Sequence, residues 1–216
     1  VVVVLDHSSA MDFSFGDEFE ETVDYVYEKA ADPTHWMNAY VDTTRIIVGG
    51  HSNGGVHASA YIESNPTRVQ GLIYMASYAG MAADISAFPG KVLSIAGSED
   101  SQSDPSTCYD EYNNFTNSDC KTWMLVNGLG HGGFGDYGNP GQPVGSIGRD
   151  SATASVRHCL LSWLESEFRN DYTANQNLND STLRPATIGE FETTCGIISG
   201  LATKLENRIT VYPNPA

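Results

Sequence analysis

Short apolar runs alternate with helix-like stretches along most of this chain, and this alternation limits the available folds more than any other feature. Each run is rich in Val, Ile, Leu or Met and has the length of a buried strand. The predicted strands are Val1–Leu5, Arg45–Val48, Gly71–Met75, Lys91–Ala96 and Thr122–Val126. The predicted helices, each with one apolar face, are Glu18–Ala31, Val56–Glu63 and Ala152–Phe168. Strands that alternate with helices form a mostly parallel sheet with helices on both faces, so we predict the α/β class.

The composition is that of a globular protein with an acidic surface. Of the 216 residues, 40% are hydrophobic and 18% are charged, and 27 acidic against 11 basic side chains give a formal net charge of −16. Such a surface repels phosphate backbones, so we expect no nucleic acid partner. We attribute the charge to solubility or a saline habitat rather than to an acidic functional patch. No segment approaches the ~20 apolar residues that cross a membrane, so we expect no transmembrane segment.

One predicted strand ends in an unusual turn, because residues 46–55 read IIVGGHSNGG. Gly50, Ser52 and Gly54 fit the pattern G-x-S-x-G, in which a serine lies at the apex of a sharp turn from a strand into a helix. The glycines leave room for the strained backbone and expose the serine hydroxyl. We therefore predict that Ser52 is a catalytic nucleophile; the alternative is a structural glycine-rich turn. The backbone N–H of Asn53 can face a developing oxyanion.

A serine hydroxyl is a weak nucleophile unless a histidine accepts its proton and an acidic residue orients that histidine. In this topology the acid and then the histidine follow later strands. After the strand KVLSIA comes GSEDSQSD, where we choose Asp100 as the acid; Glu99 is the second candidate, and Asp104 lies too far into the loop. After the strand TWMLV comes NGLGHGG, which offers His131 as the base. His158 lies in an apolar-faced helix and is assigned to packing or to the surface.

These segments resemble the α/β-hydrolase superfamily, and within it the serine esterase branch of cutinase-like polyester hydrolases, dienelactone hydrolases and platelet-activating-factor acetylhydrolases. The resemblance covers about residues 1–168 and is carried by VVVVLDH, VDTTRIIVGGHSNGG, VLSIAGSEDS and VNGLGHGG. It implies the α/β-hydrolase fold and an enzyme that cleaves carboxylic esters, with polyester or lipid-like substrates, through an acyl-enzyme and without a metal or organic cofactor. It also implies a cleft lined by Tyr78 and His51, while Asn53 replaces a methionine that is common in the polyester hydrolases.

Two other functions fit the same residues. A peptidase or amidase would use the same serine, histidine and acid, and comparing an ester with its matched anilide would separate the two. A non-catalytic surface or binding module could retain the fold without the chemistry. A fluorophosphonate probe would then fail to label the protein.

The resemblance also predicts domain boundaries. We assign residues 1–169 to the catalytic domain, residues 170–206 to a C-terminal extension or linker, and residues 207–216 to the truncated start of a secretion sorting domain. Its sequence ITVYPNPA resembles the first strand of the sorting domain of type IX-secreted proteins. This implies a secreted or cell-surface protein that engages that secretion machinery, and we expect a monomer.

The position of the serine turn differs from the superfamily pattern. In the superfamily the nucleophile follows the fifth strand, whereas Ser52 follows the second predicted strand. We therefore expect about three further strands upstream of residue 1, together with the loop that supplies a second N–H to the oxyanion.

The four cysteines bear on the location of the protein. No CxxC pair occurs, so we expect no zinc site. Among the three possible pairings we predict the disulfides Cys108–Cys120 and Cys159–Cys195; the alternative is four buried free thiols. Disulfides would agree with an oxidising, extracytoplasmic setting.

Overall fold

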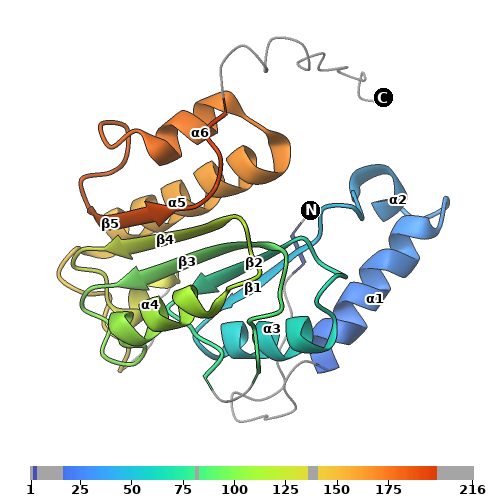
Figure 1. Ribbon diagram of the computed structural model, residues 1–216, viewed down its shortest axis with the longest axis horizontal. Helices are drawn as coiled ribbons and strands as arrows, with labels where there is room; N and C mark the ends of the chain where they lie inside the picture. The colour runs from blue at the N-terminus through green and yellow to red at the C-terminus, as the bar shows by residue number, and fades with distance from the viewer. Residues whose placement is uncertain (1, 4–16, 81–82, 136–140, 199–216) are drawn as a thin grey trace.

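A five-stranded sheet with the order β1-β2-β3-β4-β5 forms the centre of the computed structural model, which describes residues 2–3, 17–80, 83–135 and 141–198 (Figure 1). The strands are β1 (Ile47–His51), β2 (Gly71–Met75), β3 (Lys91–Gly97), β4 (Lys121–Val126) and β5 (Ile188–Thr193). The first four strands are parallel, and β5 runs antiparallel to β4. The predicted mostly parallel sheet is thus confirmed. Most of the predicted strand Val1–Leu5 and all of the sorting segment 207–216 lie outside the described residues.

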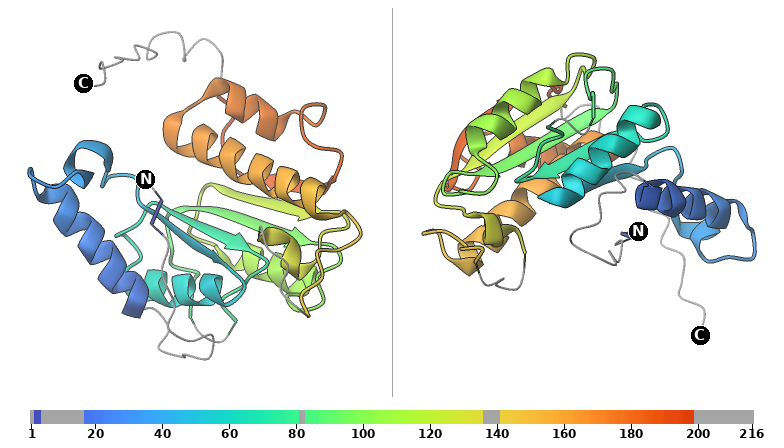
Figure 2. Two further views of the ribbon diagram at one scale, coloured as in Figure 1. Left: turned by 180° about the vertical axis from the view of Figure 1, so that it is seen from behind. Right: turned by 90° about the horizontal axis from the view of Figure 1, so that it is seen from below.

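Helices cover both faces of the sheet. They are α1 (Asp17–Ala31), α2 (Met37–Tyr40), α3 (Asn53–Ser64), α4 (Pro105–Asn114), the 3-10 helix η1 (His131–Phe134), α5 (Arg149–Arg169) and α6 (Tyr172–Asn179). The view from below shows α3 and α4 on one face of the sheet and α5 on the other (Figure 2). α6 packs against α5, and α1 packs against α2 and α3. None of the described helices is long and apolar enough to span a membrane.

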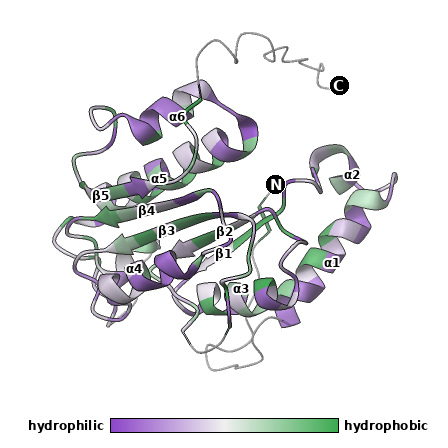
Figure 3. Ribbon diagram, viewed as in Figure 1, coloured by the Kyte–Doolittle hydropathy of each residue, from purple (hydrophilic) through white to green (hydrophobic). Residues whose placement is uncertain are grey.

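The core has one layer on each face of the sheet. Leu93 and Ile95 of β3 belong to a buried cluster with Trp163 of α5. Leu72 of β2 belongs to the cluster on the other face, together with Tyr61 of α3. Hydrophobic residues therefore run along β3 and β4, whereas much of α6 is hydrophilic (Figure 3). Burial on both faces explains why these strands read as continuous apolar runs instead of alternating ones.

The segment that we interpreted as a linker instead adds a helix and a strand to this domain. Residues 170–194 contain α6 and β5, and β5 extends the sheet beside β4. Ile188 and Phe191 pack against the cluster that includes α5, whereas Glu190 and Glu192 are exposed. An edge strand needs only one apolar face, so its sequence is polar enough to resemble a linker.

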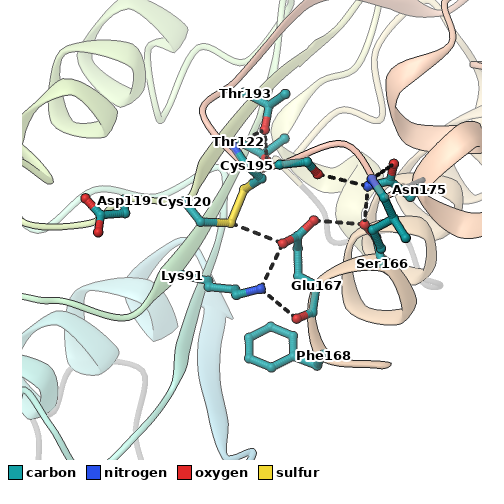
Figure 4. Close-up of polar contacts among 12 residues, drawn as sticks. Lys91, Asp119, Cys120, Thr122, Ser166, Glu167, Phe168, Asn175, Thr193 and Cys195 are labelled. Carbon is teal, nitrogen blue, oxygen red and sulfur yellow. Dashed lines mark hydrogen bonds and ion pairs between the residues drawn. A yellow bond between two sulfur atoms is a disulfide. The ribbon is translucent and has the colours of Figure 1, made fainter. Parts of the chain in front are cut away.

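The predicted disulfide pairing is wrong. The structure joins Cys120 to Cys195, with their Cα atoms 4.3 Å apart (Figure 4). Cys108 and Cys159 are buried free thiols. Because β5 pairs with β4, Cys195, two residues after the end of β5, lies beside Cys120, which directly precedes β4. Cys108 and Cys159 instead face two different apolar clusters, from α4 and α5. The undetected strand β5 is therefore the physical reason for the wrong pairing.

An ion pair stabilises the same corner of the molecule. Lys91 Nζ lies 2.9 Å from Glu167 Oε2, and the Glu167 side chain is only 7% exposed (Figure 4). The ammonium group also donates to the backbone carbonyl of Glu167 at 2.7 Å, and Ser166 donates its hydroxyl to the Glu167 carboxylate. These contacts fasten the start of β3 to the last turn of α5, next to the disulfide.

Candidate active site

The side chains predicted to be catalytic all follow the carboxyl ends of parallel strands. Ser52 comes directly after β1, Asp100 follows β3, and His131 follows β4. In sheets of this kind, ligands bind at the edge formed by the carboxyl ends of the strands. The topology thus brings three loops from distant parts of the chain to one edge.

The turn at Ser52 has a strained backbone. Its φ of 54° and ψ of −123° are rare for a residue with a side chain. The Ser52 N–H donates to the carbonyl of Met75 at 3.0 Å, and Ser77 donates its hydroxyl to the Ser52 carbonyl at 2.6 Å. A Cβ on Gly50 would lie 2.3 Å from the carbonyl carbon of Gly54, so the chain can reverse this sharply only with glycine there.

His131 and Asp100 form a buried hydrogen-bonded pair. Nδ1 of His131 lies 2.8 Å from Oδ2 of Asp100, and the two side chains are 1% and 0% exposed. The other carboxylate oxygen accepts hydrogen bonds from the backbone N–H groups of Gln102 and Ser103 at 2.8 and 2.9 Å. Burial alone would raise the pKa of Asp100, but these hydrogen bonds outweigh it and hold the pKa below its usual value. Asp100 is therefore ionised at neutral pH.

The second nitrogen of the His131 ring is free to act as a base. Nε2 is buried and has no hydrogen-bond partner among the described residues, the Ser52 hydroxyl included. Because Nδ1 faces a carboxylate, it carries the ring proton and leaves the lone pair on Nε2. Hydrogen bonds between catalytic groups are often long in the absence of substrate and shorten when it binds. The arrangement therefore suits proton transfer from a nearby hydroxyl.

The imidazole of His131 lies against the ring of His51, the residue that directly precedes Ser52. The two rings lie 4.5 Å apart between centroids, and the His51 ring stacks at 5.3 Å on Phe134 of η1. Burial, which has the larger effect, and the neighbouring His131 lower the pKa of His51 to about 4. His51 is thus a neutral ring at physiological pH, packed against His131. The sequence predicted only that it lines the cleft.

Asn53 begins α3, where the first backbone N–H groups have no acceptor within the helix. Its side-chain amide lies 3.2 Å from Nε2 of His57, one helical turn further along. The side chain is thus directed along α3, and the backbone N–H remains the group available to a ligand beside Ser52.

Tyr78 lies just beyond β2, after the residue whose hydroxyl binds the Ser52 carbonyl. It is half-buried and packs against a cluster that contains Ala96, Cys108 and Trp123. Tyr78 thus follows a residue that bonds to the serine turn, and its role in substrate contact stays a prediction.

The other two acidic candidates make different contacts. Glu99 accepts a hydrogen bond from the backbone N–H of Ser146 at 2.7 Å and another from the Ser146 hydroxyl. Asp104 caps α4 by accepting the N–H of Ser106 at 2.8 Å. Of the three acids in this loop, Asp100 is the one that the structure pairs with His131.

Two supporting residues were not identified from the sequence. Ser77 holds the serine turn, and Arg149 donates from Nη1 to the carbonyls of Gly132 and Gly135, around the histidine turn. Both contacts join segments that are distant in sequence, and no local motif marks either residue.

Among the described residues, one group of potential metal ligands converges, formed by Cys120, Glu167 and Cys195. Both sulfur atoms belong to the disulfide, and the carboxylate is paired with Lys91. This group lies at the opposite ends of β3 and β4 from Asp100 and His131, and in this form it does not fit a metal ion.

The family model described as the alpha/beta hydrolase family matches residues 28–151. This match covers more than half of the chain and includes Ser52, Asp100 and His131. No curated protein matches the chain.

Proposed function

Because this chain belongs to the alpha/beta hydrolase family, we propose that it is a serine hydrolase that cleaves carboxylic esters, with Ser52, His131 and Asp100 as its catalytic triad. Membership of the family supports hydrolysis in general. The observation that carries the finer proposal is the buried hydrogen bond between His131 and Asp100, at the sheet edge where the strained turn presents Ser52.

The reaction begins with attack of the Ser52 Oγ on the ester carbonyl carbon, while the hydroxyl proton passes to Nε2 of His131. The electron pair of the C=O bond moves to oxygen, and the Asn53 N–H donates to this oxyanion. Collapse of the intermediate breaks the ester C–O bond, and the departing alcohol takes the proton from His131. Water then gives a proton to His131 and attacks the acyl-enzyme, which releases the carboxylic acid and restores Ser52.

The role of Asp100 follows from its contacts. An ionised carboxylate at 2.8 Å keeps the proton of neutral His131 on Nδ1 and so keeps Nε2 able to accept the serine proton. When His131 becomes positively charged, the same carboxylate stabilises that charge. The two backbone N–H groups on its other oxygen fix its orientation.

The proposed substrate class is polyester or lipid-like esters. Residues 76–90, which connect β2 to β3, are too few for a separate lid domain, and this supports an open cleft that admits large substrates. His51 and Tyr78 are the proposed cleft residues, since each is next to a segment that holds the serine turn. The disulfide between Cys120 and Cys195 supports a proposed secreted or cell-surface location.

Active-site labelling tests the nucleophile. A fluorophosphonate probe should label the full-length protein, and the Ser52→Ala variant should not be labelled. The Ser52→Ala protein must show the same thermal unfolding as the wild type, because alanine keeps the Cβ and with it the backbone strain of the turn. A folded wild-type protein that is not labelled would overturn the proposal.

A pair of matched substrates tests the reaction class. We expect hydrolysis of an aryl ester to exceed that of the anilide with the same acyl group by orders of magnitude in kcat/KM. Similar values for the two would instead identify a peptidase or amidase that uses the same triad.

A further inference from the structure

The loop that carries Asp100 and the loop that carries His131 touch at several points away from the catalytic pair. The hydroxyl of Ser98 accepts a hydrogen bond from the Gly128 N–H at 2.8 Å. The Glu99 N–H donates to the carbonyl of Leu129 at 3.0 Å. Glu99 is exposed and points away from the catalytic pair, because its carboxylate binds Ser146. Ser98 and Glu99 thus both bond to the loop that carries His131.

Ser146 belongs to a segment that lies directly against the histidine turn. Gly130 donates its N–H to the carbonyl of Val144 at 2.7 Å, and Gly132 donates to that of Pro143 at 3.0 Å. These two glycines flank His131. A Cβ on Gly130 would lie 2.5 Å from the carbonyl oxygen of Pro143, so the two backbones approach this closely only with glycine. A displacement of the segment around residues 143–146 would therefore move His131.

The Glu99 carboxylate accepts two hydrogen bonds from Ser146. A hydrogen bond from the Ser146 hydroxyl, which has the larger effect, and one from its backbone N–H lower the pKa of Glu99. The carboxylate is therefore ionised at neutral pH. Hydrogen bonds to a charged acceptor are stronger than neutral ones. Asp100 is adjacent in sequence and is buried, whereas Glu99 is at the surface.

We propose that Glu99 is a positioning residue of the proposed hydrolase. Glu99 ties the segment around residues 143–146 to the loop of Asp100 and so keeps Nε2 of His131 directed at the reacting atoms. This inference rests on the proposed function. It assigns Glu99 a role other than that of a second triad acid, because its contacts are with Ser146 and not with the imidazole.

The test compares Glu99→Ala with Asp104→Ala in the full-length protein. Asp104 provides a matched control, because it also accepts hydrogen bonds from the N–H and hydroxyl of a serine, Ser106, but only within its own helix cap. We expect Glu99→Ala to lower kcat about 10- to 100-fold with KM nearly unchanged, since a small misplacement of a catalytic group costs this much. Asp104→Ala should keep kcat within about twofold, because it leaves the histidine segment in place.

A double-mutant cycle separates positioning from a general loss of stability. If Glu99 acts through Ser146, then adding Ser146→Ala to Glu99→Ala should lower kcat no further, and Glu99→Gln should recover part of the rate because its amide oxygen still accepts one hydrogen bond. Equal kcat losses for Glu99→Ala and Asp104→Ala would overturn the inference. Additive losses of kcat from Glu99→Ala and Ser146→Ala would also overturn it.

If wild-type protein shows neither labelling nor ester hydrolysis, the proposed function itself fails, which is a different outcome.

Discussion

Asp100 combines burial, a bond to His131 and two backbone hydrogen bonds, and these contacts lead to a prediction at the scale of a single residue. Asp100→Asn preserves the size of the side chain but favours the wrong imidazole tautomer. We expect kcat for an ester to fall about 10³- to 10⁴-fold, with the protein still folded. Steady-state kinetics and circular dichroism check this. Near-normal turnover would show that another acid, such as Glu99, orients the histidine.

His51 leads to a prediction about pH and stability. Its pKa is about 4 in the folded protein against a usual value of 6.5. Between these values the unfolded chain binds more protons than the folded protein, so stability falls as the pH is lowered through this window. His51→Phe keeps an aromatic ring against Phe134 and removes the titration. We expect a weaker loss of stability on acidification in the variant than in the wild type.

Urea unfolding of both proteins at several values between about pH 7.5 and pH 4.5 measures the effect. Asp100 also titrates with a lowered pKa, but it is present in both proteins and cancels in the comparison. Identical pH slopes for the wild type and His51→Phe would contradict the prediction.

At the scale of the element, the turn from β1 into α3 can be tested with two glycines that differ in their surroundings. A Cβ on Gly50 would lie 2.3 Å from backbone, whereas a Cβ on Gly54 meets nothing within 4 Å. We expect Gly50→Ala to lower the free energy of unfolding by about 1–3 kcal/mol and to abolish labelling of Ser52. Gly54→Ala should change stability by less than about 0.5 kcal/mol. Chemical denaturation of both variants checks this, and equal losses would contradict the argument.

The buried strands were the elements that the sequence predicted well. β2 has the predicted bounds Gly71–Met75, and β3 and β4 each extend one residue beyond theirs. Strands that are buried on both faces form apolar runs that can be recognised from the local sequence alone. α4, α6 and β5 were missed, because their polar sequences are stabilised by what they pack against. β5 in particular forms because its backbone can hydrogen-bond to the edge of β4.

The candidate site divides in the same way. Chain order along a parallel sheet predicted that an acid of the loop after β3, with Asp100 chosen over Glu99, would meet His131, and the structure pairs Asp100 with His131. The contacts of Glu99, Ser77 and Arg149 depend on the exact packing of loops, and no periodicity or motif encodes them. The order of the strands therefore determines which residues meet, while the loops determine how firmly they are held.

For the whole molecule, the disulfide links residues 75 positions apart. Closing a loop of this length restricts the unfolded chain, and chain-entropy arguments give about 4 kcal/mol, within a usual range of about 2–5 kcal/mol. We expect a reducing agent to lower the free energy of unfolding of the wild type by an amount in this range. A Cys120→Ala/Cys195→Ala variant should start from the lower value and should not respond to the reductant.

This pair of proteins also tests whether the corner in Figure 4 is needed for the chemistry. The disulfide lies near the starts of β3 and β4, whereas Asp100 and His131 follow their other ends. Labelling of Ser52 should therefore survive in the double variant at temperatures where it is folded. Complete loss of labelling in a folded variant would contradict this separation.

The last strand of the sheet also affects how copies of this protein meet each other. A terminal strand presents unpaired backbone groups to which an extended segment of another molecule can bond. β5 carries two carboxylates on one face, and they are held there because Trp123 donates to Glu190 at 3.2 Å and Tyr109 donates to Glu192 at 2.9 Å. A second copy that aligned against β5 would bring like charges together in the same strand pair. The residues that end the sheet thus discourage strand addition between molecules, and so oppose aggregation at high concentration.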